Sequence, residues 1–323
     1  PIMTSSEKVQ LKRAAVIYNP FAGGVSRSAR SLHRTTELLA RQGIEAVLVP
    51  TSGPGSAAEQ ARHHVEDGCD LVIAAGGDGT INEVANGLVN SRTPLAILPG
   101  GTANVLAREM RMPISIEKAA AQISTLLPKR IAAGLLTREG VERRAFLLMA
   151  GAGLDAEIVY HLDLDLKALA GKLAYYVGGF FQAMRPLREF EVIADGKSYQ
   201  ASFALISRVR NYGGDLEIAR NASLLLNEFE VVLFRGTFSL QYVPYLMAAA
   251  LKCVEKMSGV TVLRAQSVTC NRPLVGDVYV QVDGELAGKV PFSVEIMPDA
   301  LTLLVPPEYM VREQSYAAIP VCV

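Results

Sequence analysis

Through its first 130 residues the chain alternates short apolar runs with segments of helical spacing, and this alternation constrains the fold more than any other feature. Ala14–Tyr18, Leu71–Ala75 and Leu95–Leu98 are apolar runs that end in Gly, Asn or Pro, as buried strands do. Segments such as Ser28–Arg41 and Ser56–Glu66 carry the spacing of helices. Strand and helix in repetition predict a parallel sheet wrapped by helices. The other expected elements here are a strand at Ile44–Val49 and helices at Ile81–Val89 and Thr102–Met110.

Beyond about Ile131 short strands separated by Gly, Asn, Asp and Pro follow one another closely, interrupted by helical stretches at 166–184 and 242–257. This density of strands predicts a mainly antiparallel second domain, a β-sandwich. We therefore expect an α/β domain over 1–131 and a second domain over 132–323, leaving open a return of the last residues to the first domain. The expected strands are Phe146–Ala150, Phe190–Ala194, Ser202–Ser207, Glu230–Phe234, Val260–Arg264, Tyr279–Asp283 and Leu301–Val305.

Composition excludes several classes of protein. The 323 residues include 32 Lys and Arg against 32 Asp and Glu, so the basic excess expected of a nucleic-acid-binding protein is missing. Four cysteines lie far apart without C-x-x-C pairs, which disfavours a disulfide framework or a zinc site. No run approaches the roughly 18 apolar residues that span a bilayer. We expect a soluble, cytoplasmic chain.

The strongest motif is Gly76–Thr80 (GGDGT), placed directly between an expected strand and an expected helix. Glycines there allow backbone N–H groups to approach an anion, and the helix N-terminus adds partial positive charge. A carboxylate inside such a phosphate site is repulsive unless it meets Mg²⁺ or a reacting hydroxyl, which favours a functional Asp78. The structural alternative is a plain strand-to-helix turn in which Asp78 or Thr80 caps the helix.

A second glycine-rich loop, Pro99–Asn104 (PGGTAN), follows the next expected strand and leads into the next expected helix. Neighbouring parallel strands bring such loops to the same carboxyl edge of the sheet, where open α/β folds bind ligands. Two other nucleotide motifs are excluded or disfavoured. The chain has no Walker-type G-x-x-x-x-G-K-[ST] sequence. Gly151–Ala156 matches G-x-G-x-x-A, but it lacks the acidic residue and the parallel unit that a nicotinamide site needs.

Several motifs together resemble the diacylglycerol kinase catalytic-domain family, which includes bacterial lipid kinases and is related to sphingosine, ceramide and, more distantly, NAD kinases. The resemblance covers nearly the whole chain in order. Its motifs here are Asn19-Pro20, Thr51, Gly76–Leu88 (GGDGTINEVANGL), Leu98–Arg108 (LPGGTANVLAR), Gly151–Asp155 (GAGLD), Asn211–Gly214 (NYGG) and Val282–Glu285 (VDGE).

The resemblance implies a nucleotide-binding α/β domain, a C-terminal β-sandwich and an active site between them that uses ATP and Mg²⁺. It makes Glu285 the general base for a lipid hydroxyl, with Asp283 and Asp78 as further catalytic carboxylates and Asp78 as a candidate metal ligand. Without it, Asp283-Gly284 would be a hairpin turn. The implied ATP contacts are Asn19, Pro20, Thr51, Gly76, Gly77, Asp78, Gly79, Thr80, Glu83, Gly101, Thr102 and Asn104, and the lipid-site candidates are Asp155, Lys167, Gly213 and Gly214.

The chain departs from the family pattern at three places. Many bacterial members carry Asp where Val105 stands, and Asp in a V-D-x-G segment where Ala132 stands. Some members hold a structural Mg²⁺ with an Asp-Asp-Gly segment, which is Leu225–Asn227 here. These changes remove the carboxylates of that metal–water network and leave open whether a second, structural metal exists.

We therefore expect an ATP-dependent lipid kinase that works peripherally at the inner face of the membrane, with diacylglycerol as the first substrate candidate. The apolar stretch 166–184, which carries Lys167, is either a lid that admits acyl chains or a core helix. A kinase of a soluble metabolite, like NAD kinase, and a nucleotide- or lipid-binding regulatory protein with little turnover are the alternatives. The sequence leaves open which lipid is phosphorylated and whether the chain forms a homodimer.

Overall fold

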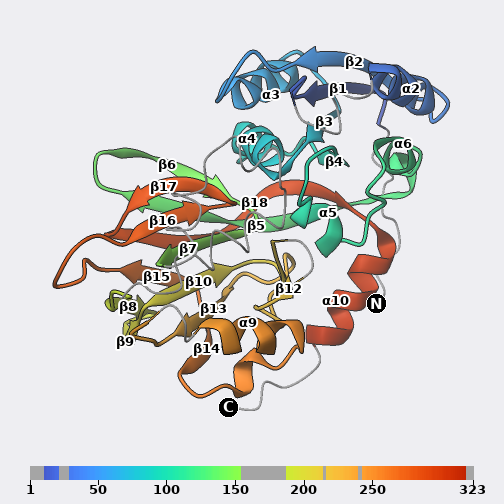
Figure 1. Ribbon diagram of the computed structural model, residues 1–323. Helices are drawn as coiled ribbons and strands as arrows, with labels where there is room; N and C mark the ends of the chain where they lie inside the picture. The colour runs from blue at the N-terminus through green and yellow to red at the C-terminus, as the bar shows by residue number, and fades with distance from the viewer. Residues whose placement is uncertain (1–10, 22–28, 154–186, 214–215, 239–241, 318–323) are drawn as a thin grey trace, which may run out of the picture.

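The computed structural model describes residues 11–21, 29–153, 187–213, 216–238 and 242–317 (Figure 1). Its first part is built from parallel strands joined by helices. The strands are β1 (Arg13–Tyr18), β2 (Glu45–Pro50), β3 (Leu71–Gly76) and β4 (Leu95–Pro99), and the helices are α2 (Ala29–Ala40), α3 (Ser56–Glu66), α4 (Asp78–Leu88), α5 (Val105–Glu109) and α6 (Ile116–Ala120).

These strands lie in the order β2-β1-β3-β4 with parallel pairing throughout. Helix α3 packs against α4, while α2 packs against α6, so the sheet is covered by two helix pairs (Figure 1). Every residue of β3 and β4 is buried, as expected of strands covered on both faces. The expected helix Ser56–Glu66 has the bounds that the sequence predicts.

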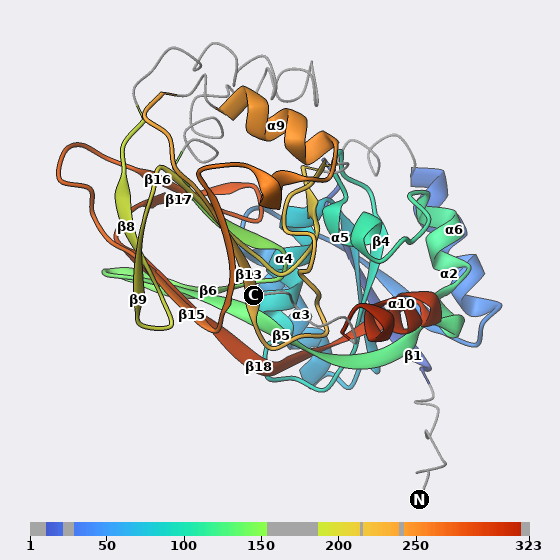
Figure 2. The ribbon, with the colours of Figure 1, turned by 90° about the horizontal axis from the view of Figure 1, so that it is seen from below.

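The second part consists mainly of antiparallel strands in two facing sheets, with β11 and β12 as a separate two-stranded sheet (Figure 2). One sheet has the order β14-β13-β10-β7-β16-β17, and the other contains β5, β6, β8, β9, β15 and β18. The bounds are β5 (Leu127–Arg138), β6 (Val141–Phe146), β7 (Met149–Gly153), β8 (Phe190–Ala194), β9 (Lys197–Ala201), β10 (Phe203–Ser207), β11 (Asn211–Tyr212), β12 (Leu216–Glu217), β13 (Phe229–Phe234), β14 (Val260–Ala265), β15 (Ser267–Cys270), β16 (Tyr279–Val282), β17 (Glu285–Lys289) and β18 (Phe292–Val305).

Apolar side chains from both sheets fill the space between them. Phe146, Phe190 and Val294 from one sheet join Ile206 and Val280 from the other in one buried cluster. This packing confirms the predicted fold class, an α/β part with a mainly parallel sheet and an antiparallel β-sandwich part.

Strand β18 links the two parts. Its Leu303 pairs with Leu95 of β4 in parallel, while the strand runs antiparallel to β5 over most of its length and to β15 at its start. The C-terminal helix α10 (Pro307–Ala317) then lies near α5 (Figure 1). The expected domain boundary at residue 131 falls inside β5.

Several expected elements were wrong in extent. The helix expected at Thr102–Met110 is the shorter α5, and the one expected at Ile81–Val89 begins earlier, at Asp78. The single strand expected over Phe146–Ala150 is in fact parts of two strands: β6 ends at Phe146 and β7 begins at Met149. The strand expected at Leu301–Val305 starts at Phe292. The helix expected over 242–257 ends earlier: α9 covers Tyr242–Ala250, followed by a turn with Lys252 at a φ of 57° and a short 3₁₀ helix. No helix among the described residues is both long and apolar enough to cross a membrane.

Candidate active site

The carboxyl ends of four parallel strands bring the predicted nucleotide loops together. Tyr18 pairs with Pro50 and Ala75, so the ends of β1, β2 and β3 lie side by side. The backbone N–H of Asn19 donates to the carbonyl of Ala75 (3.3 Å), and that of Thr51 donates to Tyr18 (2.9 Å). The side chain of Asn19 accepts a bond from Phe21 N–H (2.9 Å), which forms a local turn.

The two glycine-rich loops touch backbone to backbone. Gly100 N–H donates to the carbonyl of Gly76 (2.8 Å). A Cβ built at Gly101 would lie 2.5 Å from the Cα of Gly77, so any side chain at Gly101 would force the loops apart. The Asn104 side chain closes the second loop by bonding the N–H and the carbonyl of Gly101, both at 2.8 Å. Asn104 has a φ of 49°, a conformation that Asn tolerates better than most residues.

Asp78 joins the first loop to the second. One of its oxygens accepts the N–H of Val105 (3.0 Å) and the other that of Leu106 (3.3 Å), so Asp78 caps helix α5 although it begins helix α4. Burial raises the pKa of this carboxyl, and the backbone hydrogen bonds oppose the rise. The sequence alternative was a cap on α4; the structure shows a cap on the neighbouring helix. The roles of Asp78 as a catalytic residue and metal ligand remain predictions.

The Val282–Glu285 hairpin brings a carboxylate to the first loop. Asp283 and Gly284 form its two-residue turn, with φ values of 50° and 82°, as the D-G pair predicts. The turn places Glu285 over Gly79, because a Cβ built at Gly79 would lie 2.6 Å from Glu285 Oε1. Arg144 donates to the other oxygen of Glu285 at 2.5 Å. The segment is therefore both a hairpin turn and a part of the site.

Asp283 holds this hairpin in place. Its carboxylate accepts the N–H groups of Leu147 (3.2 Å), Leu148 (3.1 Å) and Met149 (2.9 Å) and the side-chain amide of Asn82. These N–H groups explain why β6 and β7 are separate strands. Asp283 is 7% exposed and points into the protein, so it positions Glu285 by fixing the turn. Its assignment as an assisting catalytic carboxylate remains a prediction.

Comparisons with known proteins agree with this arrangement. A model of the diacylglycerol kinase catalytic domain matches residues 13–136, and a model of the YegS C-terminal NAD kinase beta sandwich-like domain matches 149–305. The chain is 30% identical over 288 residues to a protein named diacylglycerol kinase from Bacillus subtilis, covering 87% of this chain and 92% of that protein. The chain belongs to the diacylglycerol kinase family.

Further relatives lie within the same family. A protein named diacylglycerol kinase from Staphylococcus saprophyticus is 29% identical over 290 residues, covering 87% of this chain and 91% of its own. A crystal structure of a diacylglycerol kinase from Bacillus anthracis superposes with a TM-score of 0.76, covering 93% of this chain and 99% of that one. At 23% identity that likeness shows the fold alone.

The sequence did not predict a buried cluster of charged side chains around Glu109. Glu109, at the end of α5, accepts Arg210 Nη1 and Arg312 Nη2, both at 3.1 Å. Arg210 also donates to both oxygens of Glu313 in α10, at 2.7 and 2.8 Å. Asn211 donates to Glu109 through its side chain (2.8 Å). The cluster ties α5, and through it the second glycine-rich loop, to the sandwich and to α10.

In this cluster burial and ion pairing shift the pKa values in opposite directions. Burial lowers the pKa of Arg210, but the bonds and charges of Glu313 and Glu109 outweigh it, and the pKa rises. Burial raises the pKa of Glu313, but Arg210, Ser223 and Arg312 bring it below its ordinary value. Both partners are therefore charged, and the cluster depends on all of its members.

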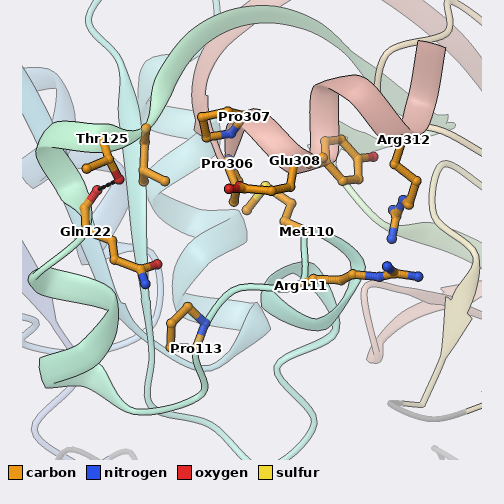
Figure 3. Close-up of a pocket in the computed structure, with 11 residues that line it drawn as sticks. Met110, Arg111, Pro113, Gln122, Thr125, Pro306, Pro307, Glu308 and Arg312 are labelled. Carbon is orange, nitrogen blue, oxygen red and sulfur yellow. Dashed lines mark hydrogen bonds between the residues drawn. The ribbon is translucent and has the colours of Figure 1, made fainter. Parts of the chain in front are cut away.

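A pocket of about 630 Å³ lies at the far end of α5 (Figure 3). Met110, Leu126, Pro306 and Tyr309 supply apolar walls, and Figure 3 shows the guanidinium groups of Arg111 and Arg312 on the same side of it. It contains none of the residues that the sequence assigns to ATP or lipid.

The remaining predicted residues fall into two groups. Thr102 is exposed, Glu83 is half-buried on α4, and Gly213 follows β11 with a φ of 60°. The lipid-site candidates Asp155, Lys167 and Gly214, and the expected helix over 166–184, lie outside the described residues. Asn82, Asn86 and Arg144 were not singled out, although the first two lie in the GGDGT–helix motif. Asn86 bonds the N–H of Ala145 (2.9 Å) and its carbonyl (2.8 Å), which holds α4 against β6.

Asp283 gives the stability of the protein a pH dependence. Burial raises the pKa of Asp283 to about 6, although backbone bonds and Arg144 oppose the rise, whereas an unfolded Asp has a pKa of about 3.9. Between these values the folded protein binds a proton that the unfolded chain releases, so stability falls as pH rises from about 4 to about 6. The contribution of Asp283 to this fall is about 3 kcal/mol.

Thermal unfolding at a series of pH values tests this expectation. Asp283→Asn should be less stable than the natural protein at every pH, because its amide cannot accept all four hydrogen bonds. Its stability should also fall less between pH 4 and 6, because the carboxyl group that titrates there has been removed. Asp299→Asn, an exposed aspartate on β18, should keep the decline of the natural protein. Identical slopes for the natural protein and Asp283→Asn would contradict the assignment.

Proposed function

We propose that this chain is an ATP-dependent lipid kinase that transfers the γ-phosphoryl group of ATP to a hydroxyl of a lipid alcohol, with diacylglycerol as the first candidate. The observation that carries the proposal is the position of Glu285 over Gly79, one carboxylate beside a glycine-rich loop at a helix N-terminus. The family membership supports a kinase, and the names of the relatives favour diacylglycerol.

The proposed chemistry follows from these positions. The Gly76–Thr80 loop would present backbone N–H groups to the phosphates, with the Gly101–Asn104 loop packed against it, and the α4 N-terminus would favour their negative charge. Glu285 would accept the proton of the attacking lipid hydroxyl. Arg144 holds one oxygen of Glu285 and leaves the other toward Gly79. Asn19, Pro20, Thr51 and Glu83 would complete the ATP site.

Mg²⁺ is the metal that phosphoryl transfer commonly needs to neutralise phosphate charge. No group of three His, Cys, Asp or Glu that could hold a metal ion occurs in the described parts of the chain. Asp78, the predicted ligand, already accepts a backbone N–H at each oxygen. A Mg²⁺ that arrives with ATP would therefore be held mainly by the phosphates and would neutralise their charge, with Asp78 as the candidate protein ligand.

The lipid substrate implies contact with a membrane. We propose that the chain works in the cytoplasm and binds peripherally to the inner face of the membrane. Release of ADP in the presence of vesicles tests the activity. Vesicles containing diacylglycerol should raise ADP release well above that with phosphatidylcholine alone. ADP release that responds to NAD and not to vesicles would indicate a kinase of a soluble metabolite, and no release with either would favour a binding protein.

Substitution of Asp78 tests the junction of the loops. Asp78→Asn keeps the size of the side chain but replaces one acceptor with an amide that faces a backbone N–H. We expect phosphoryl transfer to fall by on the order of a hundredfold, because the two loops lose their alignment, while the protein stays folded with a melting temperature a few degrees lower, because one bond of the α5 cap is lost. An unchanged rate at saturating Mg·ATP would show that Asp78 has only a local structural role.

A further inference from the structure

Arg208 is a buried cation whose hydrogen-bond partners are backbone carbonyl groups. It follows β10, is fully buried and is among the largest fully buried side chains of the protein. Among the described residues no Asp or Glu forms an ion pair with it, whereas Arg210, two residues on, binds two glutamates. Burial lowers the pKa of Arg208 to about 10, offset in part by Tyr309 and Glu228. An arginine rarely occupies such a place unless something compensates its charge.

Backbone carbonyl oxygens supply that compensation. Nη1 donates to the carbonyls of Leu226 and Glu228, the latter at 2.9 Å. Nη2 donates to the carbonyls of Leu224 (2.9 Å) and Ala132 (3.1 Å). We call these four oxygens the carbonyl cage. Rings of carbonyl oxygens are a common way for proteins to hold bound cations.

A metal ion does not fit this place. The residues that supply the oxygens of the cage include Ala132, Leu224 and Leu226, whose apolar side chains carry no metal ligand. Each of its four oxygens already accepts a guanidinium N–H. A divalent ion among them would stand beside a positive Arg208, and the nearby Glu228 carboxylate, among the described residues, already pairs with Arg264.

We propose that the carbonyl cage is a cation site whose occupant is the guanidinium of Arg208, so that this chain supplies its own cation and needs no structural metal. The guanidinium joins β5 to the loop 224–228 at the start of β13. The same residue donates its backbone N–H to Leu148 (2.8 Å), whose own N–H holds Asp283. The inference is independent of the proposed kinase activity, because its readouts are metal content and stability.

The natural protein provides the first test. Protein purified without chelator should contain far less than one metal ion per chain by elemental analysis, and EDTA should leave its melting temperature unchanged within about 1 °C. Stoichiometric metal, or a melting temperature that EDTA lowers and Mg²⁺ restores, would overturn the proposal.

Removal of the guanidinium provides the second test. Arg208→Ala leaves four buried carbonyl oxygens without donors, and we expect its melting temperature to fall by on the order of 10 °C. Millimolar methylguanidinium should restore several degrees by entering the cage. The matched control is Arg264→Ala, which removes an arginine that pairs with the Glu228 side chain on the partly exposed surface (2.7 Å), and methylguanidinium should not help it.

Two further outcomes are decisive. If Arg208→Ala melts like the natural protein, or if methylguanidinium restores the two variants equally, the cage is not a cation site. If Arg208→Ala does not fold, Arg208→Lys replaces it, because lysine keeps the charge and three donors. Arg208→Lys should then melt above Arg208→Met, and equal melting of the two would overturn the proposal.

Discussion

Replacing Glu285 with glutamine is expected to lower the rate of phosphoryl transfer by about a hundred- to ten-thousandfold. Glutamine keeps the size of the side chain and can still bond Arg144, but it cannot accept a proton from the lipid hydroxyl. The affinity for ATP and the melting temperature should stay close to those of the natural protein, since Glu285 is 47% exposed and its ion pair contributes little to stability.

A matched control separates the loss of a proton acceptor from the loss of charge. Glu142→Gln makes the same change at an exposed position of β6, on the strand that carries Arg144, and should leave the rate unchanged. If Glu285 served only as the first residue of β17, Glu285→Gln would keep nearly normal activity. Rates measured under saturating ATP and lipid decide between these roles.

Removing Glu109 is expected to cause a large loss of stability. Glu109→Ala leaves the guanidinium groups of Arg210 and Arg312 in a buried place with Glu313 as their shared partner. Breaking a buried ion pair by removing one partner costs about 3–5 kcal/mol, and here two desolvated guanidinium groups would share a single carboxylate, so one positive charge would lack compensation. Denaturant unfolding should show a midpoint shift of this size.

The control for Glu109 is a glutamate in an exposed pair. Glu117 lies 3.9 Å from Arg34 on the surface, and Glu117→Ala should cost less than about 1 kcal/mol. A loss below 1 kcal/mol for Glu109→Ala as well would contradict a stabilising role for the cluster. A double variant, Glu109→Gln with Arg210→Met, should recover part of the loss, since it removes both charges.

The sequence predicts the α/β part well because its signals are local. Buried parallel strands appear as apolar runs, and the loops that follow β3 and β4 contain the glycines that a close backbone approach requires. The position of Gly76–Thr80 beside Gly101–Asn104 follows from the parallel order of β3 and β4. The closeness of Glu285 to Gly79, in contrast, was implied only by the family resemblance.

Long-range contacts account for what the sequence could not predict. The break between β6 and β7 exists because Asp283, more than a hundred residues later, binds the N–H groups of Leu147 and Leu148. Glu109 and Glu313 look like ordinary charges on exposed helices, and only the fold brings both to Arg210. Asp78 could be predicted to cap a helix, but not that the helix would be α5.

Transfer of labelled phosphate to lipid tests the central claim most directly. The protein would be incubated with γ-labelled ATP, Mg²⁺ and mixed vesicles containing diacylglycerol, phosphatidylglycerol and sphingosine, and the extracted lipids separated. We predict that the natural protein labels one of these lipids, with diacylglycerol the first candidate, and that Glu285→Gln labels it at least a hundredfold more slowly. Label in none of the lipids, from a folded protein that binds ATP, would contradict the assignment as a lipid kinase.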